Sequence, residues 1–163
     1  ILEKIFNERA EFRVLQKGSE KEFYIVSHKT KIKNGYEFLH SIQAGPQLLP
    51  TLDLEKEGFI IKNSKGKVIR DGIGSLGKSA RSAIGIKASK EILFVTVSKT
   101  QGLTIKELAN LMKELNCISA MALDGGKSSS LIWKEKNTIK QFFGTKQLTP
   151  YVNSAIIAKK TTN

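Results

Sequence analysis

The sequence predicts an α+β (mixed α/β) fold, with a mixed β-sheet and few helices, in a single domain over residues 1–163. Two observations lead to this prediction. Short apolar runs of extended character recur along the chain, whereas only one segment has a sustained helical pattern. That segment lies between two apolar runs, and together they indicate a β-α-β unit over residues 92–123 whose two strands run parallel.

The first half of the chain is expected to form short strands where apolar residues cluster between turn residues. A hairpin is predicted from residues 12–15 and 22–26, with its turn at Gly18-Ser19. Further extended runs cover residues 36–42, 59–61, 68–69 and 83–86. The N-terminal stretch, residues 1–10, is expected to form a second helix.

The β-α-β unit has the clearest local signals. Its first strand is the apolar run ILFVTV at residues 92–97, and its second follows the helix at residues 118–123. The residues at helical spacing are Ile105, Leu108, Ala109, Met112 and Leu115. Thr104 and Glu107 form a capping-box pattern, and Asn116 suits a left-handed stop. Later strands are expected at residues 130–133, 139–143 and 154–158.

The composition is that of a globular chain, with 40% hydrophobic and 26% charged residues. The net charge of +12 is compatible with nucleic acid, an anionic surface or a phosphorylated substrate. The lysines are scattered and aromatic residues make up 7%, so we do not expect a nucleic-acid partner. No run reaches transmembrane length. The single cysteine, Cys117, has an apolar context and is expected in the core.

The most informative stretch runs from Ala122 to Ser130, with the sequence ALDGGKSSS. A hydrophobic run ends at Asp124, and two glycines and three serines follow. This order suits a strand that delivers a carboxylate to its end, where a tight loop offers N–H and hydroxyl donors to an anion. The alternative is that Asp124 is a turn residue that caps the loop.

A second glycine-rich segment, residues 72–79, matches the P-loop pattern G-x-x-x-x-G-K-S. A P-loop needs a buried strand before it and a long helix after it, and neither is predicted, so a flexible basic loop is favoured over a nucleotide-binding one. Arg81 follows this loop, and its planar fork suits bidentate binding of phosphate or carboxylate. We expect no cofactor. Neither His28 nor His40 has a metal-ligand pattern, and a metal site remains possible only at Asp124 and nearby carbonyls.

Three segments in order carry a resemblance to the phosphodiester glycosidase family. They are Gln-Ala-Gly-Pro-Gln-Leu-Leu at 43–49, Arg-Ser-Ala-Ile-Gly-Ile at 81–86, and residues 102–129 up to the Asp-Gly-Gly motif. The resemblance covers residues 36–158. Ala122 departs from the family's Asn and Lys127 from its common Gly. Family members carry an Asn-Gly-Gly-aromatic segment upstream of the position of Gln43; we expect it to precede Ile1, and its loss would instead favour a non-catalytic domain. Bacterial relatives are exopolysaccharide-related, which implies an extracytoplasmic protein.

The resemblance implies hydrolysis of the bond between a sugar anomeric carbon and phosphate. Phosphate is a good leaving group, with a second pKa of about 6, so one carboxylate with cationic and N–H donors around the phosphate suffices. The implied roles are a catalytic carboxylate or sugar-orienting group at Asp124, a phosphate clamp at Arg81, and ligand-binding groups at Gln43, Gly45, Pro46, Gly125, Gly126, Ser128 and Ser129. Gln43, Gly45 and Pro46 would form a facing wall, or alternatively a plain strand-ending turn.

A different class of function stays open. The chain could be a non-catalytic domain that binds an anionic glycan or cell-envelope polymer, and turnover of a sugar-1-phosphodiester separates the two. The sequence does not indicate an oligomeric state.

Overall fold

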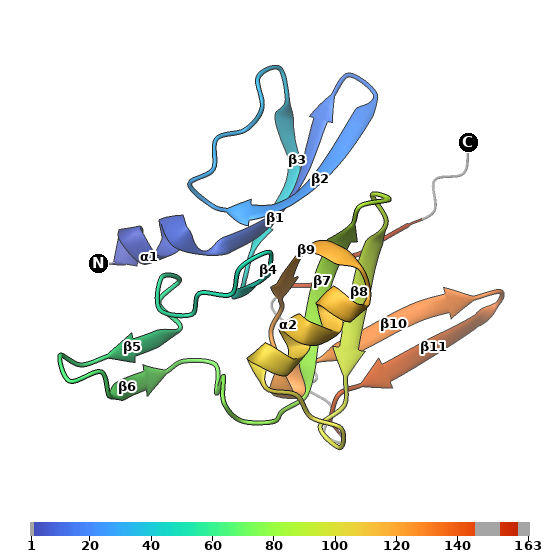
Figure 1. Ribbon diagram of the computed structural model, residues 1–163. Helices are drawn as coiled ribbons and strands as arrows, with labels where there is room; N and C mark the ends of the chain where they lie inside the picture. Colours follow the sequence, from blue (N-terminus) through green and yellow to red (C-terminus); the bar gives the residue numbers. More distant parts are fainter. Residues whose placement is uncertain (1, 146–153, 160–163) are drawn as a thin grey trace.

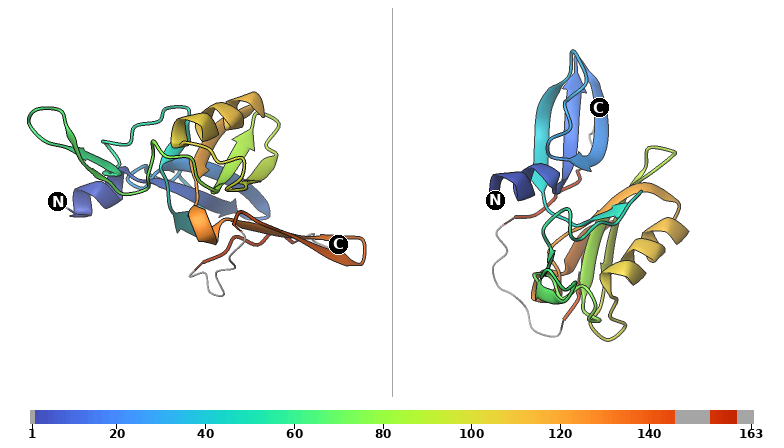
Figure 2. Two further views of the ribbon diagram at one scale, coloured as in Figure 1. Left: turned by 90° about the horizontal axis from the view of Figure 1, so that it is seen from below. Right: turned by 60° about the vertical axis from the view of Figure 1, so that its left-hand side comes forward.

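The structure is a computed structural model and describes residues 2–145 and 154–159. It is mainly β-sheet, with 45% strand and 12% helix, so the prediction of a mixed class with few helices holds in its coarse form. A three-stranded sheet, β2-β1-β3, lies against a four-stranded sheet, β4-β9-β7-β8, which carries α2 on its other face (Figure 1). Two hairpins, β5-β6 and β10-β11, project on opposite sides (Figure 2).

The three-stranded sheet follows the predicted pattern. The N-terminal helix α1 (Leu2–Glu8) leads into β1 (Ala10–Lys17), which forms a hairpin with β2 (Glu20–Ser27). The turn contains Gly18 at a φ of 59°, a conformation that glycine adopts without a steric penalty. The strand β3 (Glu37–Gln43) pairs antiparallel with the other side of β1. The helix within residues 1–10 and all three strands are therefore confirmed.

The four-stranded sheet contains the predicted β-α-β unit in a split form. Its elements are β7 (Arg81–Lys87), β8 (Ile92–Val97), α2 (Ile105–Glu114) and β9 (Cys117–Ala122), with the short β4 (Gln47–Leu49) at the edge. Both β8 and β9 are antiparallel to β7, so they are parallel to each other, as predicted. They are not neighbours, because β7 lies between them. Every strand pair in the described residues is therefore antiparallel, and the predicted mixed sheet is wrong in this respect.

The helix α2 begins and ends as its sequence indicates. The Thr104 side chain accepts a hydrogen bond from the Glu107 N–H, and the Glu107 carboxylate accepts one from the Thr104 N–H, which completes the capping box. Asn116 has a φ of 62° just beyond the helix. The apolar face of α2 packs on the sheet together with Cys117, which is buried in this core. Burial raises the pKa of its thiol, consistent with the predicted core role.

A second core lies between the two sheets. It is formed by buried residues of β1, β2, β7 and β9, namely Ala10, Phe12, Ile25, Ile84, Ile86 and Met121. The central strand β7 is buried along almost its whole length because one core covers each face. The central strand β7 begins at the candidate site, and its antiparallel neighbour β9 ends there.

The remaining elements are β5 (Ile60–Lys62), β6 (Val68–Asp71), β10 (Ser130–Glu135) and β11 (Thr138–Phe143), all close to predicted strands. The strand expected at residues 154–158 is wrong, since residues 154–159 are irregular. They contribute half-buried Ile156 to the inter-sheet core without pairing to a strand. None of the helices described is long and apolar enough to cross a membrane.

Candidate active site

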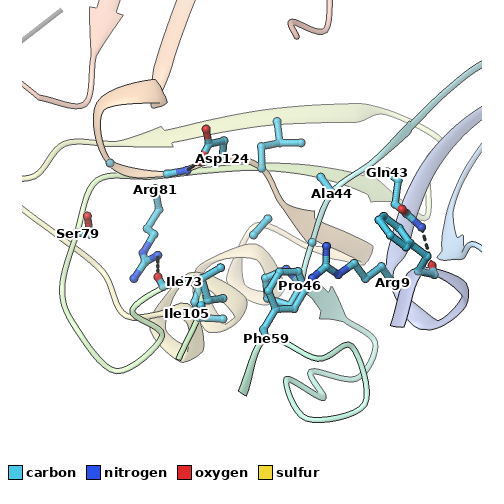
Figure 3. Close-up of a pocket in the computed structure, with 17 residues that line it drawn as sticks. Arg9, Gln43, Ala44, Pro46, Phe59, Ile73, Ser79, Arg81, Ile105 and Asp124 are labelled. Carbon is cyan, nitrogen blue, oxygen red and sulfur yellow. Dashed lines mark hydrogen bonds between the residues drawn. The ribbon is translucent and has the colours of Figure 1, made fainter. Parts of the chain in front are cut away.

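A cavity of about 560 Å³ opens where β9 ends, and it is lined by segments that are far apart in the sequence (Figure 3). Seven of the nine predicted site residues lie in its wall: Asp124, Arg81, Gln43, Gly45, Pro46, Gly125 and Gly126. Ser128 and Ser129 do not line it. The other walls come from the end of α1, Phe59, the loop after β6 and the first residue of α2. The ordered motifs therefore do converge on one cavity.

Asp124 lies just beyond the end of β9, where the Leu123 N–H donates to the Ser82 carbonyl of β7 at 2.8 Å and Ala122 is bonded on its other side. The Ala122 N–H donates to the Pro46 carbonyl at 2.9 Å, and the Gly45 N–H donates to the Ala122 carbonyl at 3.1 Å. These bonds hold the Gly45-Pro46 segment, which has a cis peptide bond, against the strand end. The Asp124 side chain is exposed, and its Oδ1 accepts a hydrogen bond from the Gly125 N–H at 2.9 Å. Its Oδ2 has no hydrogen-bond partner in the described part of the chain.

The loop after Asp124 uses most of its donors within the protein. The Gly125 N–H is bound to Asp124, and the Gly126 N–H donates to the Ala80 carbonyl at 2.9 Å. Ser129 is 1% exposed, so a ligand in the cavity does not reach its hydroxyl. The predicted substrate contacts at Ser128 and Ser129 are therefore not supported by their positions. Gly125 and Gly126 line the cavity with backbone whose N–H groups are already engaged.

Arg81 lies in the cavity wall but is 5% exposed, and backbone carbonyls occupy most of its guanidinium. Its Nε donates to Leu103 at 2.9 Å and its Nη1 to Ile73 at 3.0 Å. Its Nη2 donates to Gly74 at 2.7 Å and to Gly77 at 2.9 Å. Of the five guanidinium N–H groups, one on Nη1 is left. A bidentate phosphate clamp needs two, so this geometry does not provide the predicted clamp.

The P-loop look-alike is folded around Arg81 and Asp71. The Asp71 carboxylate accepts from the Ile73 N–H, the Ser75 N–H and the Ser75 hydroxyl, at 3.3, 2.7 and 2.9 Å. The loop carbonyls face Arg81, so the backbone N–H groups of the loop do not form a phosphate cradle. The strand β7 follows this loop where a P-loop requires a helix. The nucleotide-binding alternative is therefore wrong.

Two residues at the site were not predicted from the sequence. Arg9 lines the cavity, with its guanidinium carbon 4.7 Å from the centre of the Phe59 ring and 5.8 Å from that of Phe6. Glu57 is 4% exposed beneath the wall, and its carboxylate accepts from the Ala10 N–H at 3.0 Å and the Gln47 N–H at 2.8 Å. Burial raises the pKa of Glu57, against the effect of these two hydrogen bonds. No local pattern distinguished Arg9 among 27 basic residues.

The predicted facing wall is rigidly held. The Gln43 side-chain amide donates to the Phe6 carbonyl at 2.7 Å, which ties β3 to α1. Gly45 has a φ of 124°, and a Cβ at this position would lie 3.0 Å from the Glu57 carboxylate. This close approach favours glycine. Among the residues described, no cluster of three or more His, Cys, Asp or Glu side chains could hold a metal ion.

The protein is a small β-sheet domain, and the residues that line its cavity include one carboxylate, at the end of a strand, and two arginines. The family model for phosphodiester glycosidase matches residues 4–158, so the chain belongs to the phosphodiester glycosidase family. This confirms the resemblance that the sequence motifs indicated. No curated protein sequence matches the chain.

Several solved structures are similar. The catalytic domain of zebrafish N-acetylglucosamine-1-phosphodiester alpha-N-acetylglucosaminidase, auto-inhibited by its pro-peptide, is 20% identical, with a TM-score of 0.51 over 76% of this chain and 41% of that one. A hypothetical protein from Synechocystis is 18% identical (TM-score 0.44; 77% and 30% covered). A putative exported protein from Burkholderia pseudomallei is 25% identical (TM-score 0.48; 68% and 24%). The chain thus spans less than half the length of these structures.

Proposed function

We propose that the cavity binds a sugar-1-phosphodiester and that the domain hydrolyses the bond between the anomeric carbon and the phosphate oxygen. The observation that carries this proposal is the position of Asp124. It is the one carboxylate among the residues that line the cavity, and it shares the wall with two arginines. Membership of the phosphodiester glycosidase family supports the reaction class.

The reaction requires an attacking oxygen on one face of the anomeric carbon and a departing phosphate on the other. Asp124 would either take a proton from an attacking water or attack the anomeric carbon directly, in which case water then hydrolyses the glycosyl–Asp124 ester and frees the carboxylate. The bond from this carbon to the phosphate oxygen breaks, and its electron pair leaves with the phosphate monoester. The free Oδ2 of Asp124 suits either role, because the Gly125 N–H holds Oδ1. Positive charge at the phosphate stabilises the departing group.

The alternative is a non-catalytic domain that binds an anionic glycan. One observation favours it: Asp124 is exposed, and its carboxylate already accepts a hydrogen bond from the neighbouring N–H, as a turn residue does. The family resemblance also leads us to propose an extracytoplasmic location, which fractionation of cells that produce the protein would test.

The test compares Asp124→Asn with Asp53→Asn. Asp53 is also exposed and accepts a hydrogen bond from a nearby backbone N–H, that of Lys56, but it does not line the cavity. With the methyl diesters of several sugar 1-phosphates as substrates, Asp124→Asn should lower turnover by about 10²–10⁴-fold at an unchanged melting temperature. Asp53→Asn should retain activity.

Full activity of the Asp124→Asn protein would remove the catalytic role. A wild-type protein that binds these diesters without turnover would establish the binding domain instead.

A further inference from the structure

Among the described residues, the cavity is lined by two cationic side chains, Arg9 and Arg81. They differ in how many guanidinium N–H groups remain available to a ligand. Arg81 is buried and donates to four backbone carbonyls. The loop after Asp124 adds little, because the Gly125 and Gly126 N–H groups are engaged. An anionic ligand therefore needs a donor other than those the sequence motifs supply.

Arg9 has that capacity. Its Nε donates to the Glu57 carbonyl at 3.3 Å, and its two Nη groups make no hydrogen bond or ion pair to any residue that the structure describes. A guanidinium carries four N–H groups on its Nη atoms, and they lie in one plane as a fork. The adjacent Glu57 carboxylate does not use this fork, because its oxygens accept from two backbone N–H groups.

The aromatic rings beside Arg9 hold it in place. Its guanidinium carbon lies over the Phe59 and Phe6 rings, and these cation–π contacts do not use its N–H groups as hydrogen-bond donors. An arginine that is already fixed in this way loses less side-chain entropy when it binds an anion. Figure 3 shows Arg9 beside Phe59 and Pro46, well apart from Asp124 across the cavity.

We infer that Arg9 is the anion-binding residue of this cavity and that it takes the phosphate group of the ligand in a bidentate pair, while Arg81 holds the loop after β6 against Leu103. The inference rests on the proposed function in one respect, that the cavity is the ligand site. It also assigns an orientation, with the phosphate toward Arg9 and the sugar toward Asp124. Displacement at the anomeric carbon needs the attacking and leaving groups on opposite faces, and this orientation provides that.

The experiment titrates glucose 1-phosphate into the isotopically labelled protein and follows amide resonances. In the wild type, the amide resonances of Arg9 and Phe59 should shift as glucose 1-phosphate is added and reach a plateau. Unphosphorylated glucose should not change their chemical shifts. Arg9→Gln should weaken binding about 10- to 100-fold, the range for loss of a charged, two-bond contact. Arg70→Gln removes the same charge from an exposed site outside the cavity and should change affinity less than about twofold. Arg9→Lys should fall between the two, since it keeps the charge and loses the fork.

The inference is overturned if the Arg9 and Phe59 amides do not respond to glucose 1-phosphate, or if Arg9→Gln and Arg70→Gln weaken binding equally. The wild-type shifts decide the matter even if the Arg9→Gln protein does not fold. The titration uses a phosphate monoester and measures binding without turnover. Hydrolysis of a sugar-1-phosphodiester can therefore fail while the Arg9 contact stands, and the Arg9 contact can fail while hydrolysis proceeds.

Discussion

Arg81→Lys keeps a positive charge at position 81 but removes the guanidinium that holds four backbone carbonyls. These carbonyls belong to Leu103 and to the loop after β6, and a lysine ammonium cannot reach both sides at once. We expect two or three of the four hydrogen bonds to be lost. Hydrogen bonds from a charged donor contribute about 1.5–3 kcal/mol each, but Gly74 and Gly77 lie on the surface, where water replaces the donor.

The free energy of unfolding should therefore fall by about 2–4 kcal/mol, a large part of the 5–15 kcal/mol that is typical of a domain. Urea unfolding measures this directly. The matched control is Arg70→Lys, at an exposed position, which should change the value by less than about 0.5 kcal/mol. The reasoning is refuted if Arg81→Lys leaves stability within that margin while it abolishes binding of glucose 1-phosphate. Arg81 would then bind the phosphate, and Arg9 would not.

Two further predictions concern the groups behind the cavity and the sheet. Glu57 has a raised pKa, so its neutral form contributes stability that is complete below the ordinary value of 4.5 and is lost as the pH rises through the folded-state value. At acid pH the free energy of unfolding of Glu57→Gln, measured with urea, should be about 1–3 kcal/mol below that of the wild type, because the amide NH₂ faces a backbone N–H. This difference should shrink toward neutral pH, and a difference that stays constant with pH would contradict the prediction. Gly85→Ala places a Cβ 2.5 Å from Met112 and 2.6 Å from Cys117, so thermal unfolding should show a loss of about 1–3 kcal/mol. Gly77→Ala, with its nearest atom at 3.6 Å, is the control, and equal stability of the two variants would exclude overpacking at Gly85.

The elements that the sequence predicted well are those fixed by local interactions. The α2 boundaries depend on Thr104, Glu107 and Asn116, all of which act within a few residues of the helix ends. The hairpins depend on turns between adjacent apolar runs. The position of β7 between β8 and β9 is different in kind, because it is decided by which strands share a core. The three-residue β4 is too short to give a pattern, and residues 154–158 have strand character but pair with no strand in the described part of the chain.

The site divides in the same way. Sequence motifs located most of the cavity wall, because Asp124 and the Gly45-Pro46 segment sit at strand ends that one sheet brings together. They could not show which donors are free. Whether Arg81 can bind phosphate depends on carbonyls up to 22 residues away, and the Arg9 contact with Glu57 joins residues 48 apart. A residue type indicates what a side chain can donate, whereas the tertiary contacts determine what it has left.

The two halves of the proposed site belong to different layers of the fold, and one short segment joins them. The Ala44 N–H donates to the Ala10 carbonyl, next to Arg9, and the Gly45 N–H donates to the Ala122 carbonyl, two residues before Asp124. The buried Glu57 carboxylate binds both Ala10 and Gln47 on either side of this connection. The distance between the anion-binding arginine and the carboxylate is therefore set by residues 44–47 and by Glu57. Glu57→Gln should then weaken turnover beyond its effect on stability, because it loosens the spacing that displacement at an anomeric carbon requires.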